Sequence, residues 1–193
     1  MNEAPLGLLS SILVVLILLS GFFSSSETGM MSLNRYRLKH LRKQNHRGAR
    51  RASKLLDRPD RLIGLILIGN NAVNILASAI ATVIAIRLWG DAGIAIATIC
   101  LTLVILVFAE ITPKTIAALY PERIAFPASV ILLPLMKAMY PVVWLVNGVT
   151  NGLLRLLGVD AGAAKEEHVS SEELRTIVTE AGALIPPRHR GML

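Results

Sequence analysis

The sequence predicts an all-α membrane protein with three transmembrane helices, juxtamembrane or re-entrant helices and a C-terminal cytosolic helix. Composition is the first indication, because 53% of the 193 residues are hydrophobic and 17% are charged. The second indication is that the apolar residues form blocks of about 20 residues, the length of helix that crosses a bilayer. The third is that 11 of the 20 Lys and Arg residues fall between Arg35 and Arg61, which makes one connecting segment strongly basic.

The three predicted spans cover residues 6–26, 62–86 and 92–113. The second span has no charged residue over its 25 positions. No Lys or Arg precedes the first span, so it lacks the basic start of a cleaved signal peptide and is expected to remain as a transmembrane helix. The single cysteine, Cys100, lies inside the third span, which excludes a disulfide framework and a thiolate metal cluster.

The basic residues set the expected orientation. Because they follow the first span directly, the positive-inside rule places them in the cytoplasm. The N-terminus is then outside and the C-terminus cytoplasmic, in a multi-pass protein of the plasma membrane. We expect a cytosolic helix over residues 33–58 that lies along the membrane, with anionic lipid headgroups meeting the cations of residues 35–61. Nucleic acid is the alternative partner for such charges, but a position between two spans disfavours it.

Residues 123–157 form an apolar region of a different kind. Pro127, Pro134 and Pro141 recur every seven residues, and Lys137 lies in the middle of the region. A single straight span here would be too long and would place a lysine in the hydrocarbon layer. We therefore predict bent juxtamembrane helices, either re-entrant or interfacial. A fourth crossing with proline kinks is the alternative.

The composition changes after residue 158, where the predicted transmembrane domain of residues 1–158 ends. Residues 159–193 are expected to be a cytosolic linker and a helix. Ser170 and Glu173 have the spacing of a capping box at the start of that helix, and Pro186 and Pro187 prevent its continuation. We expect the helix to lead into a further soluble domain.

Polar residues occur at one expected depth in all three spans. Ser20 and Ser24 lie near the cytoplasmic end of the first span, Asn70 and Asn74 near the start of the second, and Glu110 near the end of the third. Each pair is four residues apart and so shares a helix face. Back-bonding or interhelical hydrogen bonds would explain a single such residue. Three clusters at one level, one with a costly carboxylate, predict a shared polar pocket.

The oxygen atoms of this predicted pocket favour a hard cation. Hydroxyl, amide and carboxylate oxygens suit Mg²⁺, Ca²⁺ or Na⁺, and the absence of His and Cys at this depth disfavours a zinc or redox site. The sequence contains no Ser-His-Asp arrangement, no P-loop and no GxGxxG motif. No enzymatic activity is therefore predicted.

Three segments resemble the transmembrane domain of the CorB/CorC and CNNM magnesium transport proteins: LLSGFFSSSETGMMSLNRYRLKHL, LILIGNNAVNILAS and VFAEITPKTIAALYPERIA. The tail TEAGALIPPRH is similar to the stretch that precedes their paired CBS domains. The resemblance covers essentially the whole chain. It implies a homodimer with three crossings per protomer and a cytosol-facing acidic cavity for Mg²⁺. It also implies Mg²⁺ efflux coupled to Na⁺ entry, with ATP acting only through a CBS pair that this chain lacks.

The resemblance implies a metal-ligand role for the side chains that the depth argument selected. The SGxFS, GNxxVN and EIxPK motifs of the family fall on Ser20, Ser24, Asn70, Asn74 and Glu110, with Pro113 in the last motif. Asn71 and Glu27 are further candidates. The leading interpretation is a Mg²⁺ exporter. The alternatives are a membrane Mg²⁺ sensor or regulatory subunit that transports nothing itself, and a membrane anchor for a soluble domain.

Overall fold

The computed structural model describes residues 5–156, which form helices and short connections and contain no strand. The predicted linker and helix of residues 159–193 lie outside the described residues. The chain divides into two compact units, Met1–Trp144 and Leu145–Leu193. The first unit contains every element described below except the later part of the last helix. The prediction of an all-helical protein is confirmed for the described part of the chain.

Two helical segments are long and apolar enough to cross a membrane, Leu6–Met31 and Pro59–Leu119. A third candidate arises if the helices Pro121–Ala138 and Tyr140–Thr150 are counted as one broken span. The first segment is α1 (Leu6–Met31). Its N-terminal half exposes large apolar side chains, whereas the residues that α1 buries all lie in its C-terminal half. Contacts between helices therefore concentrate at one end of α1.

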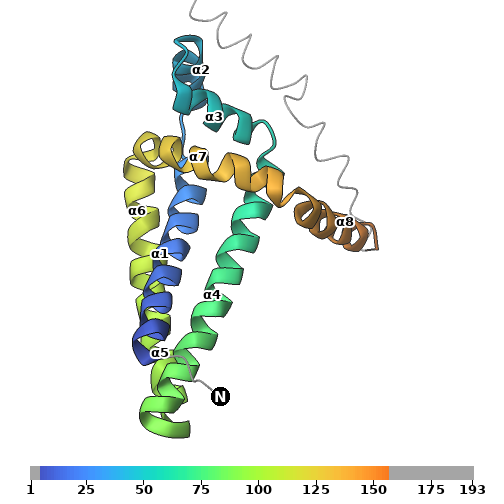
Figure 1. The fold of residues 1–193 in the computed structure, drawn as a ribbon. Helices are drawn as coiled ribbons and strands as arrows, with labels where there is room; N and C mark the ends of the chain where they lie inside the picture. Colours follow the sequence, from blue (N-terminus) through green and yellow to red (C-terminus); the bar gives the residue numbers. More distant parts are fainter. Residues whose placement is uncertain (1–4, 157–193) are drawn as a thin grey trace, which may run out of the picture. The chain divides into compact units, whose positions relative to one another are not determined.

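The second segment reverses direction in its middle. α4 (Pro59–Trp89) ends at Gly90, whose φ of +64° is a conformation that favours glycine. The short 3₁₀ turn η1 (Gly90–Ala92) then leads into α5 (Gly93–Val104), which packs back against α4 (Figure 1). The chain continues as the π-helix η2 (Ile105–Ile111) and as α6 (Thr112–Leu119). Both η2 and α6 contact α1, so the segment returns alongside it.

The basic segment forms two helices where one, over residues 33–58, was predicted. α2 (Arg35–Lys43) is capped by Asn34, whose side chain accepts hydrogen bonds from two backbone N–H groups of the first turn. α3 (Arg47–Leu56) is capped by His46, whose Nδ1 accepts from the Ala49 N–H at 3.2 Å. Between the helices Asn45 has a φ of +61°. This left-handed residue and the new cap end one helix and start the next, which the hydrophobic pattern did not indicate.

The helix α7 (Pro121–Ala138) crosses the ends of α1 and α4 and packs against α3, the second of the two basic helices. It contacts α1, α3 and α4 (Figure 1). Small and branched residues form this contact, since the buried faces of α3 and α7 share one hydrophobic cluster. Its members from these two helices are Ala49, Ala52, Leu55, Leu56, Ala125, Ala128 and Leu132.

The helix breaks at Met139, and α8 (Tyr140–Leu156) follows. The region predicted to be bent, residues 123–157, thus contains two helices and no single uninterrupted span in its described part, residues 123–156. Pro141 lies in the first turn of α8, where its missing N–H costs no helical hydrogen bond. Pro127 and Pro134 lie inside α7, and both are exposed.

Candidate functional site

A direct hydrogen bond between two predicted site residues joins α1 to α4. The Ser20 hydroxyl donates to Asn70 Oδ1 at 2.9 Å, and Ser20 is 1% exposed. Close by, the ring of Phe23 packs onto Gly69, where a Cβ atom would lie only 2.7 Å from Phe23 Cζ. The glycine therefore allows the two helices to approach closely at the level of the polar residues.

The π-helix η2 meets α1 at this same level. A Cβ atom at Gly21 would lie 3.4 Å from Pro113 Cγ and 3.7 Å from Ala109 Cα. Gly21 is next to Ser20 in the chain, and Ala109 is next to Glu110. The three helical segments that carry the predicted site residues are therefore close neighbours at one level of the first unit.

Glu110 lies in the seven-residue π-helix, in which hydrogen bonds span five residues instead of four. Pro113 explains this geometry, because it has no N–H and its ring would clash with a carbonyl one α-helical turn earlier. The wider turn relieves the clash, and the Thr112 N–H donates to the Val107 carbonyl. Short π-helical segments are frequent at functional sites. Pro113 was identified from the sequence motif, but the π-helix was not predicted.

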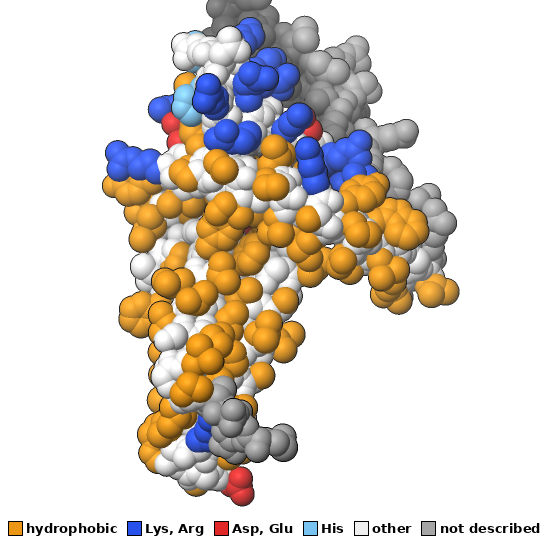
Figure 2. All heavy atoms as spheres, in the orientation of Figure 1, with side chains coloured by type: hydrophobic (Ala, Val, Ile, Leu, Met, Phe, Trp, Pro, Cys, Tyr) orange, Lys and Arg blue, Asp and Glu red, His pale blue; other side chains and the backbone are white. Residues whose placement is uncertain are grey.

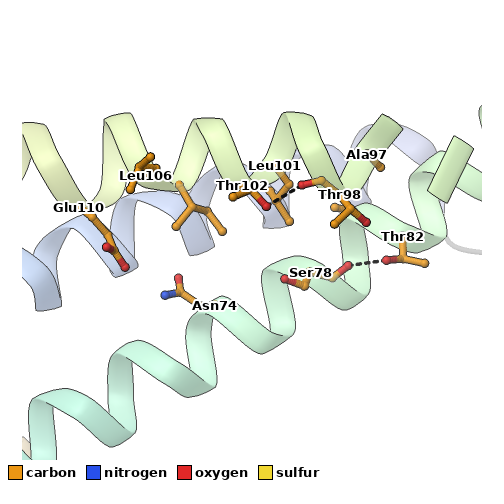
Figure 3. Close-up of a pocket in the computed structure, with 11 residues that line it drawn as sticks. Asn74, Ser78, Thr82, Ala97, Thr98, Leu101, Thr102, Leu106 and Glu110 are labelled. Atoms are coloured by element: carbon orange, nitrogen blue, oxygen red, sulfur yellow. Dashed lines mark hydrogen bonds between the residues drawn. The ribbon is translucent and has the colours of Figure 1, made fainter. Parts of the chain in front are cut away.

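A cavity of about 360 Å³ lies between α4 and the α5–η2 segment. Two predicted site residues line it, Asn74 from α4 and Glu110 from η2, and Figure 3 shows their side chains pointing toward one another across it. Ser20, Ser24 and Asn70 are not among its lining residues. The predicted set is thus divided: Ser20 and Asn70 form a packed α1–α4 contact, Asn74 and Glu110 line an open cavity beside it, and Ser24 is buried on α1.

Buried oxygens without partners occur on both α1 and α4. Ser24 Oγ and Asn74 Oδ1 are buried and have no hydrogen-bond partner in the described chain. Ser26 Oγ shares this property and was not predicted, although it follows Ser24 in a run of serines. A buried polar atom left unpaired costs about 1–3 kcal/mol. Coordination of a cation would recover that cost.

The cavity continues beyond Asn74 along hydroxyl groups that were not predicted from the sequence to be site residues. They are Ser78 and Thr82 on α4 and Thr98 and Thr102 on α5. Thr82 and Thr102 donate to the carbonyls of Ser78 and Thr98 at 2.8 and 2.7 Å (Figure 3). The protons of the Thr82 and Thr102 hydroxyls are then occupied, and these two oxygens keep lone pairs that can face a cation. The spacing of four residues within each pair was the signal for a shared face.

The two further candidates differ from this group. The Glu27 carboxylate has a counter-charge of its own, since Lys114 Nζ lies 4.0 Å from its Oε2. Asn71 is exposed on α4. Neither residue lines the cavity.

Among the residues that line the cavity, Glu110 is the one carboxylate, and the other polar side chains are neutral. No three His, Cys, Asp or Glu side chains gather within residues 5–156 in a way that could hold a metal. The oxygens near Glu110 belong to hydroxyl and amide groups. Such oxygens bind hard cations such as Mg²⁺, but without the negative charge of a site built from several carboxylates. Such an arrangement can replace part of a hydration shell and still release the ion.

Comparison with known proteins identifies the family. The family model for the cyclin M transmembrane N-terminal domain, CNNM, matches residues 11–185. The chain belongs to the CNNM family. The match includes all three segments that form the site, so the family identified from the motifs is confirmed.

Bacterial CNNM proteins are the curated relatives with high identity. The chain is 57% identical over 91% of its length to the UPF0053 inner membrane protein YfjD of Escherichia coli, and 53% identical over 100% of its length to a UPF0053 protein of Haemophilus influenzae. It spans 41% and 46% of the lengths of these two relatives. A protein of Salmonella typhimurium named polyamine export protein is 28% identical over 92% of the chain and is covered over 42% of its own length. Together with the apolar helices, these matches establish a membrane protein.

Proposed function

We propose that this CNNM domain is the transmembrane part of a homodimeric secondary transporter that exports Mg²⁺ from the cytosol, with Na⁺ entry as the coupled movement. Each protomer crosses the plasma membrane three times, by α1, by α4 and by the α5–η2–α6 segment. The N-terminus lies outside, and the basic helices α2 and α3 lie on the cytoplasmic side. The ion is the cargo. Its first ligands are Asn74 and Glu110, which line the cavity, and Ser24, whose Oγ has no partner. Ser20 and Asn70 join them by giving up the hydrogen bond that they share.

The observation that carries this proposal is the pairing of an unpartnered buried oxygen with a carboxylate across one cavity. Asn74 Oδ1 is buried without a hydrogen bond, and Glu110 lies on the opposite wall. A carboxylate inside a membrane helix is retained where it faces a polar pathway. Ser24 Oγ supplies a second unpartnered oxygen on the neighbouring helix.

The hydroxyls further along the cavity supply the continuation of the path. Ser78, Thr82, Thr98 and Thr102 lead away from Glu110 toward the η1 end of α4 and α5, which is the outer end in the proposed orientation. In this proposal the ion is held at Glu110 and then leaves past these neutral oxygens.

A second candidate cargo is an organic polyamine cation. Two relatives have the name polyamine export protein. In this chain Leu101, Ile105 and Leu106 form apolar walls beside Glu110. Such walls suit the alkyl segments of a polyamine, while the carboxylate would bind one of its ammonium groups. A doubly charged metal ion, in contrast, is bound by oxygen ligands and gains no binding energy from apolar walls.

The test is transport by purified protein in liposomes, with Glu110→Gln as the variant. The change keeps the size of the side chain and removes its charge. We expect Mg²⁺ flux to fall by at least roughly 100-fold, because the loss of even an outer partner of a metal ligand costs about 10–100-fold. Glu122→Gln is the matched control, since that carboxylate pairs with Arg37 outside the cavity, and it should transport normally.

The outcomes separate the candidates. Mg²⁺ binding to wild-type protein without any flux would support the sensor interpretation and contradict export. Flux of a polyamine that Mg²⁺ does not inhibit would favour the second cargo. Normal Mg²⁺ flux through Glu110→Gln would overturn the assignment of the site.

A further inference from the structure

A strongly basic pocket of about 450 Å³ lies at the corner between α2 and α3. Ser53, Leu133 of α7 and Asp57 contribute to its lining. The other lining residues are all cationic: Arg42, Arg47, Arg50, Arg51 and Lys54. Asp57 is the single acid against these five cations. The pocket therefore has the charge of an anion-binding site.

Two of the arginines are held in place by neutral serines. Arg51 Nε donates to Ser129 Oγ at 3.3 Å, and Ser129, which is fully buried, donates in turn to the Phe126 carbonyl at 2.6 Å. Arg42 Nη1 donates to Ser53 Oγ at 3.1 Å. These bonds orient both guanidinium groups without neutralising them. Their remaining N–H groups stay available for an anion, which guanidinium binds in a two-pronged geometry.

The cations of α3 share one face of the helix and lack acidic partners. Arg47, Arg50, Arg51 and Lys54 are spaced three, four and seven residues apart, and like charges at these spacings destabilise a helix. Within residues 5–156 no carboxylate lies at ion-pair distance from any of these four. The fold tolerates the arrangement because the opposite face of α3 is anchored in the core through Ala49, Ala52 and Leu55. An anion between the cations would remove the repulsion.

The surroundings of the pocket indicate an anion with an apolar tail. Leu133 of α7 lines the pocket, and Val130 and Ile131 of the same helix are 52% and 54% exposed. Figure 2 shows Lys and Arg side chains gathered over α2 and α3, where the broad apolar surface below them ends. A soluble phosphate would use the cations but not the exposed apolar residues. A phospholipid would use both.

We propose that the α2–α3 pocket binds the phosphate of an anionic glycerophospholipid whose acyl chains lie along the exposed apolar face of α7. Arg47 and Arg50 contact the phosphate, and Arg51, fixed by Ser129, sets its position. This lipid site is separate from the cavity at Glu110 and does not depend on the identity of the cargo.

The experiment measures lipid retention by native mass spectrometry on the full chain purified in neutral detergent. The probes are phosphatidylglycerol, phosphatidylcholine and, as the soluble source of the same chemistry, inorganic phosphate. The test variant is Arg47→Gln with Arg50→Gln. The control is Arg58→Gln with Lys137→Gln, which removes the same charge from residues that do not line the pocket.

Wild type and control should retain phosphatidylglycerol in preference to phosphatidylcholine, and the test variant should bind it roughly 30-fold more weakly, as expected for the loss of two cations near an anionic lipid. A variant with Arg47→Lys and Arg50→Lys keeps both charges and should retain most of the binding, which separates charge loss from misfolding. If test and control variants lost phosphatidylglycerol binding equally, the lipid would be held by diffuse electrostatic attraction, and the proposal of a specific binding pocket would be wrong. Retention of inorganic phosphate as strong as that of phosphatidylglycerol would overturn the lipid assignment.

Discussion

At the α1–α4–η2 contact the polar atoms are buried and nearly all neutral, whereas at the α2–α3 corner they are exposed and nearly all cationic. Ser20 and Ser24 are at most 1% exposed, and Glu110 brings the only carboxylate of the cavity. At the corner, Arg47, Arg50 and Lys54 are exposed to solvent. Both regions belong to the same compact unit, Met1–Trp144.

The difference shows how environment sets the strength of a polar group. A few neutral oxygens can hold an ion in the buried contact, because electrostatic interactions are strong where water is excluded. Their action depends on position to within an ångström. The exposed cations each contribute little and are screened by salt, so that binding there needs many of them and tolerates their movement. Geometry should therefore dominate at the first region, and charge number at the second.

Among changes that leave every predicted ligand in place, the largest effect is expected from Pro113→Ala, which alters the geometry of the first region. The new N–H group allows ordinary α-helical bonding and removes the reason for the π-helix. Glu110 would then rotate away from Asn74. We expect Mg²⁺ flux in liposomes to fall by about tenfold or more, with a melting temperature equal to or above that of the wild type.

Pro127→Ala is the matched control for this change. Pro127 lies inside α7 and is exposed, so its replacement should leave transport unchanged. If Pro113→Ala transported at the wild-type rate, the π-helix would have no role in placing Glu110, and the contrast between geometry and charge would lose its basis.

An intermediate effect is expected from Gly69→Ala. The added Cβ would lie 2.7 Å from the Phe23 ring, which is only 8% exposed, and crowding in a packed core costs about 1–3 kcal/mol. Thermal unfolding in detergent should reveal a lower midpoint for this variant. Gly7→Ala is the control, because nothing lies within 4 Å of a Cβ at Gly7. Restoration of the midpoint by Phe23→Leu in the Gly69→Ala background would identify the ring as the cause.

The smallest effect is expected for an exposed charge pair on the basic side. Arg37 Nε lies 2.6 Å from Glu122 Oε1, with side chains 66% and 30% exposed. Such pairs contribute less than about 1 kcal/mol. A double-mutant cycle with Arg37→Gln and Glu122→Gln, followed by thermal unfolding, should give a coupling below that value. A coupling of several kcal/mol would show that exposed charges here act like buried ones.

The helices and the level of the site were predictable because both depend on local pattern. Uncharged runs identified α1 and α4, and the basic segment identified the helices that follow α1. Spacings of four residues placed Ser20 with Ser24 and Asn70 with Asn74. The crossing number and the metal-ligand roles stay predictions.

Several features were not predictable because they depend on contacts between segments far apart in the sequence. The hydrogen bond from Ser20 to Asn70 could not be distinguished from separate contacts with an ion. The break at Asn45 results from a left-handed backbone and from a cap by His46, which rarely caps a helix. The hydroxyls of Ser78 and Thr102 acquire a common role only when α5 folds back on α4.

The sequence by itself determined that this CNNM chain is a helical membrane protein. Whether a helix inserts into a bilayer depends on its own hydrophobicity and charge, which are local properties of the sequence. The sequence also determined which polar residues share a level, because the rise per residue is fixed. Only the tertiary structure decided which of these oxygens satisfy one another and which are left for a ligand. That choice depends on how closely α1, α4 and η2 approach, and the approach is set by side chains from different helices, Phe23 against Gly69 and Pro113 against Gly21.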